Sequence, residues 1–274
     1  MHRVMTLLLA AWAVAFPATV AGGTQTIRDV VYDFRQVAAL AKGLERTLAA
    51  RRARVALIGR IDLKAEIMPP GVRFSHAAIA VYSRIETRDG RLVPGYAIYN
   101  LYQGDARTGV SHLAQDYPVD YLAVSQKLEV GVIIPGAALQ RALLATIFSD
   151  SYAQLHNPRY SAISNPFNMD FQNCTEFVVD VLFAAIYGTD DRRRLKANIS
   201  AYFEPHPLQV DESRLRYVAG SNPDVTLEDH SGPVAIATFE SIARFLQRFR
   251  LAEESFVFAV DPTTLYGSTD ELRL

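Results

Sequence analysis

The feature that most limits the fold of this chain is a tight turn between two strand-like runs. Asp89-Gly90 favours a hairpin turn, and residues 74–83 and 92–103 on either side are rich in apolar and aromatic residues. A hairpin makes adjacent strands antiparallel. Further strand patterns cover residues 55–61, 128–134 and 255–260, and helical patterns cover 27–52, 137–148, 174–186 and 239–249. This order predicts an α+β fold, with helices packed on a mostly antiparallel sheet.

Other segments predict less regular structure. Residues 111–122 are expected to form a short helix and a loop, and residues 192–233 are polar and expected to be irregular. Gly188 is expected to end the helix of residues 174–186 in a left-handed conformation.

The first residues have the pattern of a secretory signal peptide. A short basic start precedes an uncharged apolar run over residues 4–16, and small residues follow up to Gly22. The apolar run is shorter than the roughly 20 residues that span a bilayer. We expect residues 1–22 to be a signal peptide and residues 23–274 to be a single periplasmic or secreted α+β domain, without a further integral membrane segment. An uncleaved N-terminal anchor is the alternative.

Composition excludes several classes of protein. The 28 Lys and Arg residues nearly cancel the 29 Asp and Glu residues. Neutralising the phosphates of a nucleic acid requires a basic surface, so we expect no nucleic-acid partner. One Cys excludes an intramolecular disulfide and a Cys-cluster metal site, and the acidic residues show no ligand spacing. We therefore expect neither a metal nor an organic cofactor.

The single cysteine stands where a helix is predicted to begin. Asn173 is a good N-cap, and Glu176 three residues later suits a capping box. Cys174 then takes the first helical position, where the helix dipole and free backbone N–H groups favour the thiolate and lower its pKa. The same N–H groups can stabilise an oxyanion, with Gln172 assisting. A small buried core residue is the alternative role for Cys174.

His76 is the histidine best placed to act as a base for this thiol. It lies in a strand-like run among small neighbours, which leave room for another element to approach the imidazole. A third polar group is needed to orient the ring. A two-residue turn places Gln103 opposite His76, whereas a longer loop or a bulge near Pro94-Gly95 places Asn100 there. A buried structural histidine is the alternative.

Three segments, "FSHAAIAVYS", "EVGVIIP" and "NCTEFVVDVLFAAIYG", resemble the circularly permuted papain-like proteins. That group contains permuted NlpC/P60-type and lecithin:retinol acyltransferase-like proteins. Its catalytic His lies on an early strand, a polar residue on the next strand orients it, and an Asn-Cys motif begins a later helix. The resemblance covers about residues 55–190 and implies roles for His76, Asn173 and Cys174. Residues 191–274 are a C-terminal elaboration without a counterpart.

The chain also resembles an uncharacterised family of secreted bacterial proteins, a domain of unknown function that implies no activity. The papain-like resemblance implies an exported cysteine-dependent hydrolase or acyltransferase, a peptidase, amidase or thiol acyltransferase with a Cys-His dyad or triad. We expect it to act on an amide, peptide or ester bond in a peptide or acyl substrate of the cell envelope. Phe74, Tyr82 and Phe167 are expected to line the substrate cleft. A catalytically silent papain-like binding module of the periplasm is the alternative.

Overall fold

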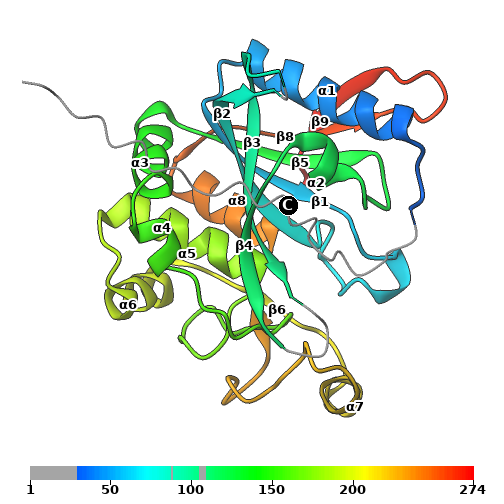
Figure 1. Ribbon diagram of the computed structural model, residues 1–274. Coiled ribbons are helices and arrows are strands. Elements are labelled where there is room, and N and C mark those ends of the chain that lie inside the picture. The colour runs from blue at the N-terminus through cyan, green and yellow to red at the C-terminus, as the bar shows by residue number, and fades with distance from the viewer. Residues whose placement is uncertain (1–29, 88, 105–108) are drawn as a thin grey trace, which may run out of the picture.

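An antiparallel sheet of seven strands organises the fold (Figure 1). The computed structural model describes residues 30–274 except residues 88 and 105–108, so the predicted signal peptide lies outside the described residues. In spatial order the strands are β4 (Ser111–Asp116), β3 (Leu92–Gln103), β2 (His76–Glu86), β1 (Val55–Arg60), β5 (Glu129–Pro135), β8 (Ala252–Val260) and β9 (Gly267–Glu271). Each neighbouring pair is antiparallel. The predicted α+β class with a mostly antiparallel sheet is confirmed.

The hairpin between β2 and β3 has a longer connection than a two-residue turn. The last strand pair is Glu86 with Leu92, and within the loop the Thr87 backbone N–H donates to the Arg91 carbonyl over 2.9 Å. Gly90 takes a φ of 77°, a left-handed conformation that suits glycine. The loop therefore gives the hairpin a register that differs from both registers considered for the sequence, one of which places Gln103 opposite His76 and the other Asn100.

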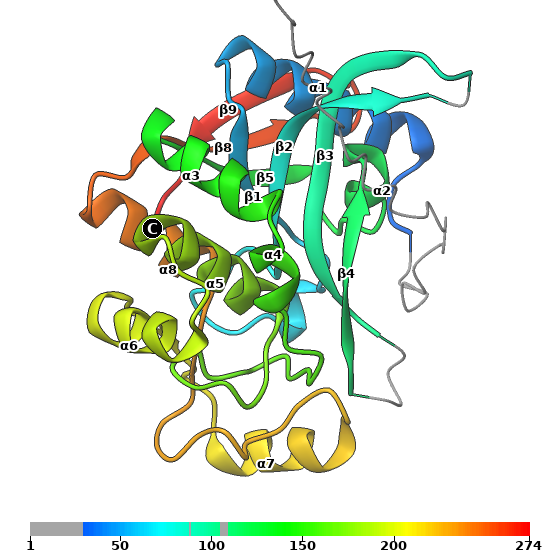
Figure 2. The ribbon, with the colours of Figure 1, turned by 60° about the vertical axis from the view of Figure 1, so that its left-hand side comes forward.

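Helices cover both faces of the sheet (Figure 2). On one face, α1 (Phe34–Ala50) and α2 (Pro118–Leu122) pack against alternate residues of the central strands. On the other, α3 (Ala137–Ile147), α4 (Ser151–Gln154), α5 (Cys174–Tyr187) and α8 (Phe239–Arg248) pack against the intervening residues. Because successive strand residues point to opposite faces, each central strand contributes to two apolar cores. Its interior is accordingly buried on both sides.

Two glycines allow large aromatic rings to lie directly on the sheet. Gly59 of β1 pairs with Gly131 of β5. A Cβ at Gly131 would lie 2.5 Å from the Phe239 ring and 2.8 Å from the Phe74 ring, so only glycine leaves enough space. The two rings meet edge to face with centroids 5.1 Å apart. This contact fixes the segment that leads into β2.

The C-terminal elaboration contains more regular structure than predicted. Helix α6 (Arg192–Tyr202) and helix α7 (Glu212–Ser221) are capped by the carboxylates of Asp191 and Asp211. Strands β6 (His206–Pro207) and β7 (Ala235–Ile236) pair with each other, and a 3₁₀ turn, η1 (Ala65–Ile67), lies between β1 and β2. Both ribbon views place α7 at the opposite end of the molecule from α1 (Figures 1 and 2). The prediction of an irregular segment over residues 192–233 was wrong for these helices.

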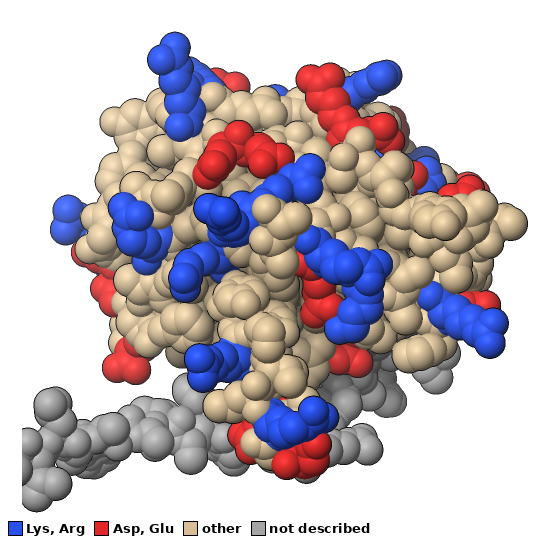
Figure 3. Space-filling view, turned by 90° about the horizontal axis from the view of Figure 1, so that it is seen from above, with Lys and Arg blue, Asp and Glu red and all other residues tan. Residues whose placement is uncertain are grey.

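The surface carries both signs of charge. On the face seen from above, several Lys and Arg side chains lie close together across the middle and left of the view, and Asp and Glu side chains lie among them and towards the edges (Figure 3). Within the described part of the chain, no helix is both long enough and apolar enough to cross a bilayer.

Candidate functional site

His76 begins β2 within a row of polar side chains that crosses the sheet. It pairs with Arg60 of β1, and its ring stacks on Tyr102 of β3 with centroids 5.3 Å apart and 27° between the planes. Tyr121 of α2 covers the imidazole from the helix layer, with centroids 5.7 Å apart, and its hydroxyl donates to the His76 carbonyl over 3.1 Å. The ring is thus held by aromatic contacts and is only 7% exposed.

Asn100 is the polar residue on β3 that bonds His76. Its Oδ1 lies 3.4 Å from His76 Nε2, and its Nδ2 donates to Asp116 Oδ2 over 3.2 Å. A carboxylate only accepts, so Asp116 takes the Nδ2 donor and turns Oδ1 towards the imidazole. His76 Nε2 then carries the proton, which leaves Nδ1 as the basic nitrogen. Tyr102 also donates to Asp116 Oδ2, over 2.5 Å.

Cys174 occupies the first position of α5. The Asn173 Oδ1 accepts from the backbone N–H groups of Thr175 and Glu176, over 3.0 and 2.9 Å. Among the described residues, no group accepts a hydrogen bond from the Cys174 backbone N–H, as is usual in the first helical turn. That N–H is therefore able to bind an oxyanion. Glu176 does not complete the predicted capping box, because its carboxylate turns inward to Lys196.

The thiol is more buried than the sequence suggested. Burial raises the pKa of Cys174, although the Ala77 backbone N–H and the Thr175 hydroxyl, 3.7 Å from the sulfur, oppose that rise by hydrogen bonding. Burial therefore acts against the lowered thiol pKa that the helix start predicts, and it favours the neutral thiol in the free protein. The Ala77 contact also places the sulfur against the residue that follows His76, so the thiol and the imidazole lie at the same end of β2.

Gln103 and Gln172 lie elsewhere in the network. The Gln103 amide donates to the carboxylate of Asp224, in the C-terminal elaboration, rather than to His76. Gln172 is fully buried, and its Nε2 donates to the Leu155 carbonyl over 3.1 Å and to Asp180 Oδ2 over 2.7 Å. Both of its amide hydrogens are used inside the protein, which leaves neither for an oxyanion. Gln172 instead fixes the loop before Cys174.

The three aromatic residues expected to line a cleft do not lie together. Phe74 is 2% exposed and packs over the paired glycines. Tyr82 is 43% exposed and meets Tyr96 edge to face, six positions along β2 from His76, which is about 20 Å of strand. Phe167 is 37% exposed on the loop before α5.

Sequence reasoning missed a buried ion pair beside His76. Arg60 Nη2 lies 3.1 Å from Asp62 Oδ2, both side chains are under 5% exposed, and Ser75 Oγ donates to Asp62 Oδ1 over 2.5 Å. The guanidinium lies over the Tyr121 ring at 4.5 Å. An arginine at the end of the otherwise apolar run Val55–Arg60 was the available signal for a buried charge.

A second buried charge cluster lies beneath the start of α5. Lys196 of α6 bonds Glu176 Oε1 and Asp180 Oδ1, each over 2.7 Å. Burial raises the pKa of Glu176 to about 7, Lys196 acts to lower it, and Asp180 adds to the rise. The cluster joins α6 to the helix that carries Cys174.

The loop before α5 is bound to the C-terminal elaboration. Asp229 Oδ2 accepts from the Asn165 backbone N–H over 2.7 Å, and the Asp229 carbonyl accepts from Asn168 Nδ2 over 2.8 Å. The Ala162 backbone N–H donates to the Asp224 carbonyl over 2.7 Å. The elaboration therefore positions the segment that ends at Cys174. Within the residues that the structure describes, no group of three or more His, Cys, Asp or Glu side chains could hold a metal ion.

Comparison with known proteins identifies the family of the chain. No curated protein and no solved structure matches it. Residues 47–246 match the family model described as "Uncharacterized protein conserved in bacteria (DUF2145)". The matched region runs from the end of α1 into α8 and contains His76, Asn100, Asp116 and Cys174. The chain therefore belongs to this uncharacterised bacterial family.

Proposed function

We propose that the protein is an exported cysteine-dependent hydrolase or acyltransferase that acts on an amide, peptide or ester bond of a cell-envelope substrate. One observation carries the proposal: the Cys174 sulfur accepts a hydrogen bond from the backbone N–H of Ala77, so it lies at the end of β2 where Asn100 bonds His76. The residue types and their order along the chain also agree with the papain-like resemblance. This is the arrangement of nucleophile, base and orienting group that thiol acyl transfer uses.

The first step transfers a proton and forms a carbon–sulfur bond. Because burial favours the neutral thiol, the proton of Cys174 moves to His76 Nδ1 as the sulfur attacks the substrate carbonyl carbon. Asn100 Oδ1 accepts from Nε2–H throughout and stabilises the imidazolium that forms. The carbonyl oxygen becomes an oxyanion, which the Cys174 backbone N–H binds.

The second step releases the first product and regenerates the thiol. The tetrahedral intermediate collapses, the bond to the leaving amine or alcohol breaks, and His76 gives its proton to that leaving group. The acyl group remains on Cys174 as a thioester. Water, or an acceptor alcohol or amine, then attacks the thioester while His76 takes its proton, and that proton returns to the departing sulfur. Hydrolysis and acyl transfer therefore share one site and differ only in the acceptor.

The test is to trap the thioester. The protein is treated with p-nitrophenyl acetate, and the acetyl adduct is located by mass spectrometry of the intact chain and of its peptides. We expect acetyl on Cys174, no adduct in Cys174→Ala, and an acylation rate at least about a hundredfold lower in His76→Ala. His206→Ala, at a half-buried histidine of β6 that bonds the Pro70 carbonyl, is the control and should react like the native chain. An adduct elsewhere, or an unchanged rate without His76, contradicts the proposal.

A binding module is the second candidate, and the burial of the thiol favours it. The Cys174 side chain is 7% exposed, and burial raises its pKa, as in an inert core cysteine. In that case the protein holds an envelope ligand without turnover. Ligand binding that persists in Cys174→Ala, together with no acyl adduct in the native chain, would select this candidate.

A further inference from the structure

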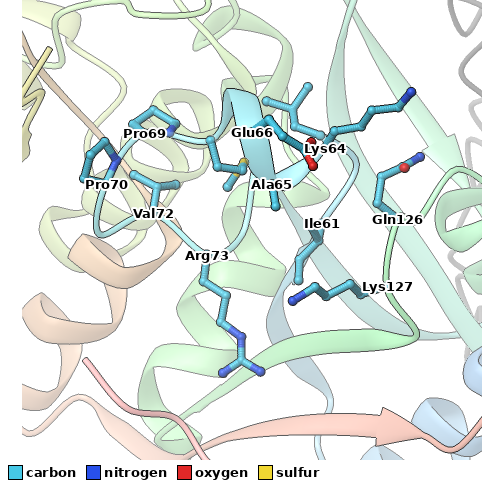
Figure 4. A pocket seen from close by; sticks show the side chains of 12 residues that line it. Ile61, Lys64, Ala65, Glu66, Pro69, Pro70, Val72, Arg73, Gln126 and Lys127 are labelled. Carbon is cyan, nitrogen blue, oxygen red and sulfur yellow. The ribbon is translucent and has the colours of Figure 1, made fainter.

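A hollow of about 620 Å³ lies at the end of β1, next to the strand that carries His76 (Figure 4). Its walls come from the loop between β1 and β2 and from the start of the segment that leads into β5. The size is within the range of pockets for small molecules. The Gln126 backbone N–H donates to the Ile61 carbonyl over 2.6 Å, which fixes the two walls relative to each other.

Apolar side chains make up about half of the wall of the hollow. They include Ile61, Leu63, Met68, Pro69 and Val72. Ile61 is buried, whereas Leu63, Met68, Pro69 and Val72 are half-buried and remain accessible to a ligand. Water on such surface is released when an apolar chain replaces it, which favours binding.

The charged groups around the hollow are mostly cationic. Lys64, Arg73 and Lys127 contribute to its lining, with Glu66 as the one carboxylate of that lining. Arg73 already pairs with Glu129, over 2.6 Å. Lys127 forms no ion pair with any residue that the structure describes, and in Figure 4 its side chain extends towards Ile61 and Arg73. An ammonium group beside an apolar wall attracts an anion more strongly than one in bulk water.

Two segments that line the hollow are continuous with strands of the candidate site. Ile61 follows Arg60, which pairs with His76, and Arg73 lies three positions before His76. Glu240 of α8 fixes this approach, because its Oε1 accepts from the backbone N–H groups of Arg73 and Phe74 over 3.0 and 3.1 Å. The segments that border the hollow therefore lead directly into the strands that carry Arg60 and His76.

We propose that this hollow recognises the substrate, and that it takes an apolar chain bearing an anionic group, with the anion at Lys127. The inference rests on the proposed function and names its substrate class as an amphiphilic anion. The apolar wall selects the chain, and the lysine selects its charge. A neutral chain of the same length gains only the apolar contact.

The test measures binding in the full chain carrying Cys174→Ala, which cannot turn over. Octanoate and the neutral 1-octanol are titrated by calorimetry. We expect octanoate to bind about tenfold more tightly than octanol, and Lys127→Glu to weaken octanoate about tenfold without affecting octanol. Lys42→Glu, the same charge change on exposed α1, is the matched control and should leave both affinities unchanged. Val72→Gln should weaken both ligands.

Three results would overturn the inference. They are equal affinity for octanoate and octanol, an unchanged octanoate affinity in Lys127→Glu, and binding of an acidic peptide at Lys127 with no binding of octanoate. Because Cys174 is absent from the assay, its outcome is separate from that of thioester trapping. Octanoate binding without acylation rejects the enzymatic proposal, and acylation without octanoate binding rejects the ligand class.

Discussion

A chain of hydrogen bonds across three neighbouring strands orients the His76 imidazole. Asp116 on β4 accepts from Asn100 on β3, and Asn100 Oδ1 faces His76 on β2. The amide of Asn100 is fully buried, so it has no water to replace a lost partner. Asp116 is therefore a positioning residue, which acts on His76 through Asn100.

Substitution of Asp116 should separate positioning from stability. Asp116→Ala removes the acceptor that orients Asn100, so we expect acylation of Cys174 to slow about tenfold, the equivalent of one hydrogen bond. Asp116→Asn keeps an acceptor oxygen and should recover most of the rate. Tyr102→Phe removes the other donor to Asp116 but leaves the Asn100 bond intact, and should change the rate by less than about threefold. The pH profile of acylation is the readout, and equal profiles for Asp116→Ala and the native chain would contradict this role.

The sequence indicated part of this site and left part of it open. Cys174, Asn173 and His76 were predictable because helix capping and strand alternation are local. The choice between Asn100 and Gln103 depended on the register of the hairpin, which a loop longer than two residues decides. Asp116 was not predicted, because its segment was expected to be a helix and a loop. Burial of the thiol depends on packing between distant elements, which no local pattern reports.

The paired glycines show how one element constrains its neighbour. Phe74 and Phe239 occupy the space above Gly59 and Gly131, so the start of β2 and the start of α8 are fixed against the sheet centre. Each glycine is needed for the close approach of a ring, since a methyl group at either position would overlap it.

A single added methyl group should therefore destabilise the fold. Gly131→Ala forces the two rings apart, and we expect the free energy of unfolding to fall by about 1–3 kcal/mol. Gly232→Ala, where a Cβ meets nothing within 4 Å, is the matched control and should leave stability nearly unchanged. Denaturation with urea measures both. The prediction would be contradicted if Gly131→Ala lost no more unfolding free energy than Gly232→Ala, since the two rings would then move aside without cost.

Elements with strong local signals were predicted correctly, and those that depend on partners were not. Strands β1, β2, β3 and β5 and helices α1, α3, α5 and α8 follow their apolar patterns. Strand β4, "SHLAQD", lacks β-branched residues and forms through its pairing with β3. Helix α6 begins with three arginines, which oppose the helix dipole, and the Asp191 cap compensates for them.

At the scale of the molecule, a buried charge cluster couples α6 to α5, the helix that carries Cys174, and makes stability depend on pH. Glu176 has a pKa of about 7 in the folded state, above its ordinary value of 4.5, mainly because it is buried. Between these values the folded state binds more protons than the unfolded state. The free energy of unfolding therefore decreases as pH rises from about 4.5 to about 7.

Removing the Glu176 carboxylate should make the free energy of unfolding depend less on pH. In Glu176→Gln, we expect the change in unfolding free energy between about pH 5 and pH 7.5 to be smaller than in the native chain by on the order of 1 kcal/mol. The comparison is of slopes, so any uniform loss of stability in the variant does not matter. Glu204→Gln, at an exposed carboxylate, serves as the control. The assignment would be contradicted if, as pH rises over this window, the native chain gained unfolding free energy relative to Glu176→Gln.

The central claim, that Cys174 and His76 act as one unit, is tested most directly without a substrate. The measurement is the rate of Cys174 alkylation by iodoacetamide as a function of pH, in the native chain and in His76→Ala, with His206→Ala as the control. We predict that the imidazole of His76, together with the thiol, determines how the native alkylation rate depends on pH. In His76→Ala, the pH profile should shift to higher pH, and the rate near neutral pH should fall at least about tenfold. Identical profiles for the native chain and His76→Ala would contradict the claim and leave Cys174 as a buried structural thiol.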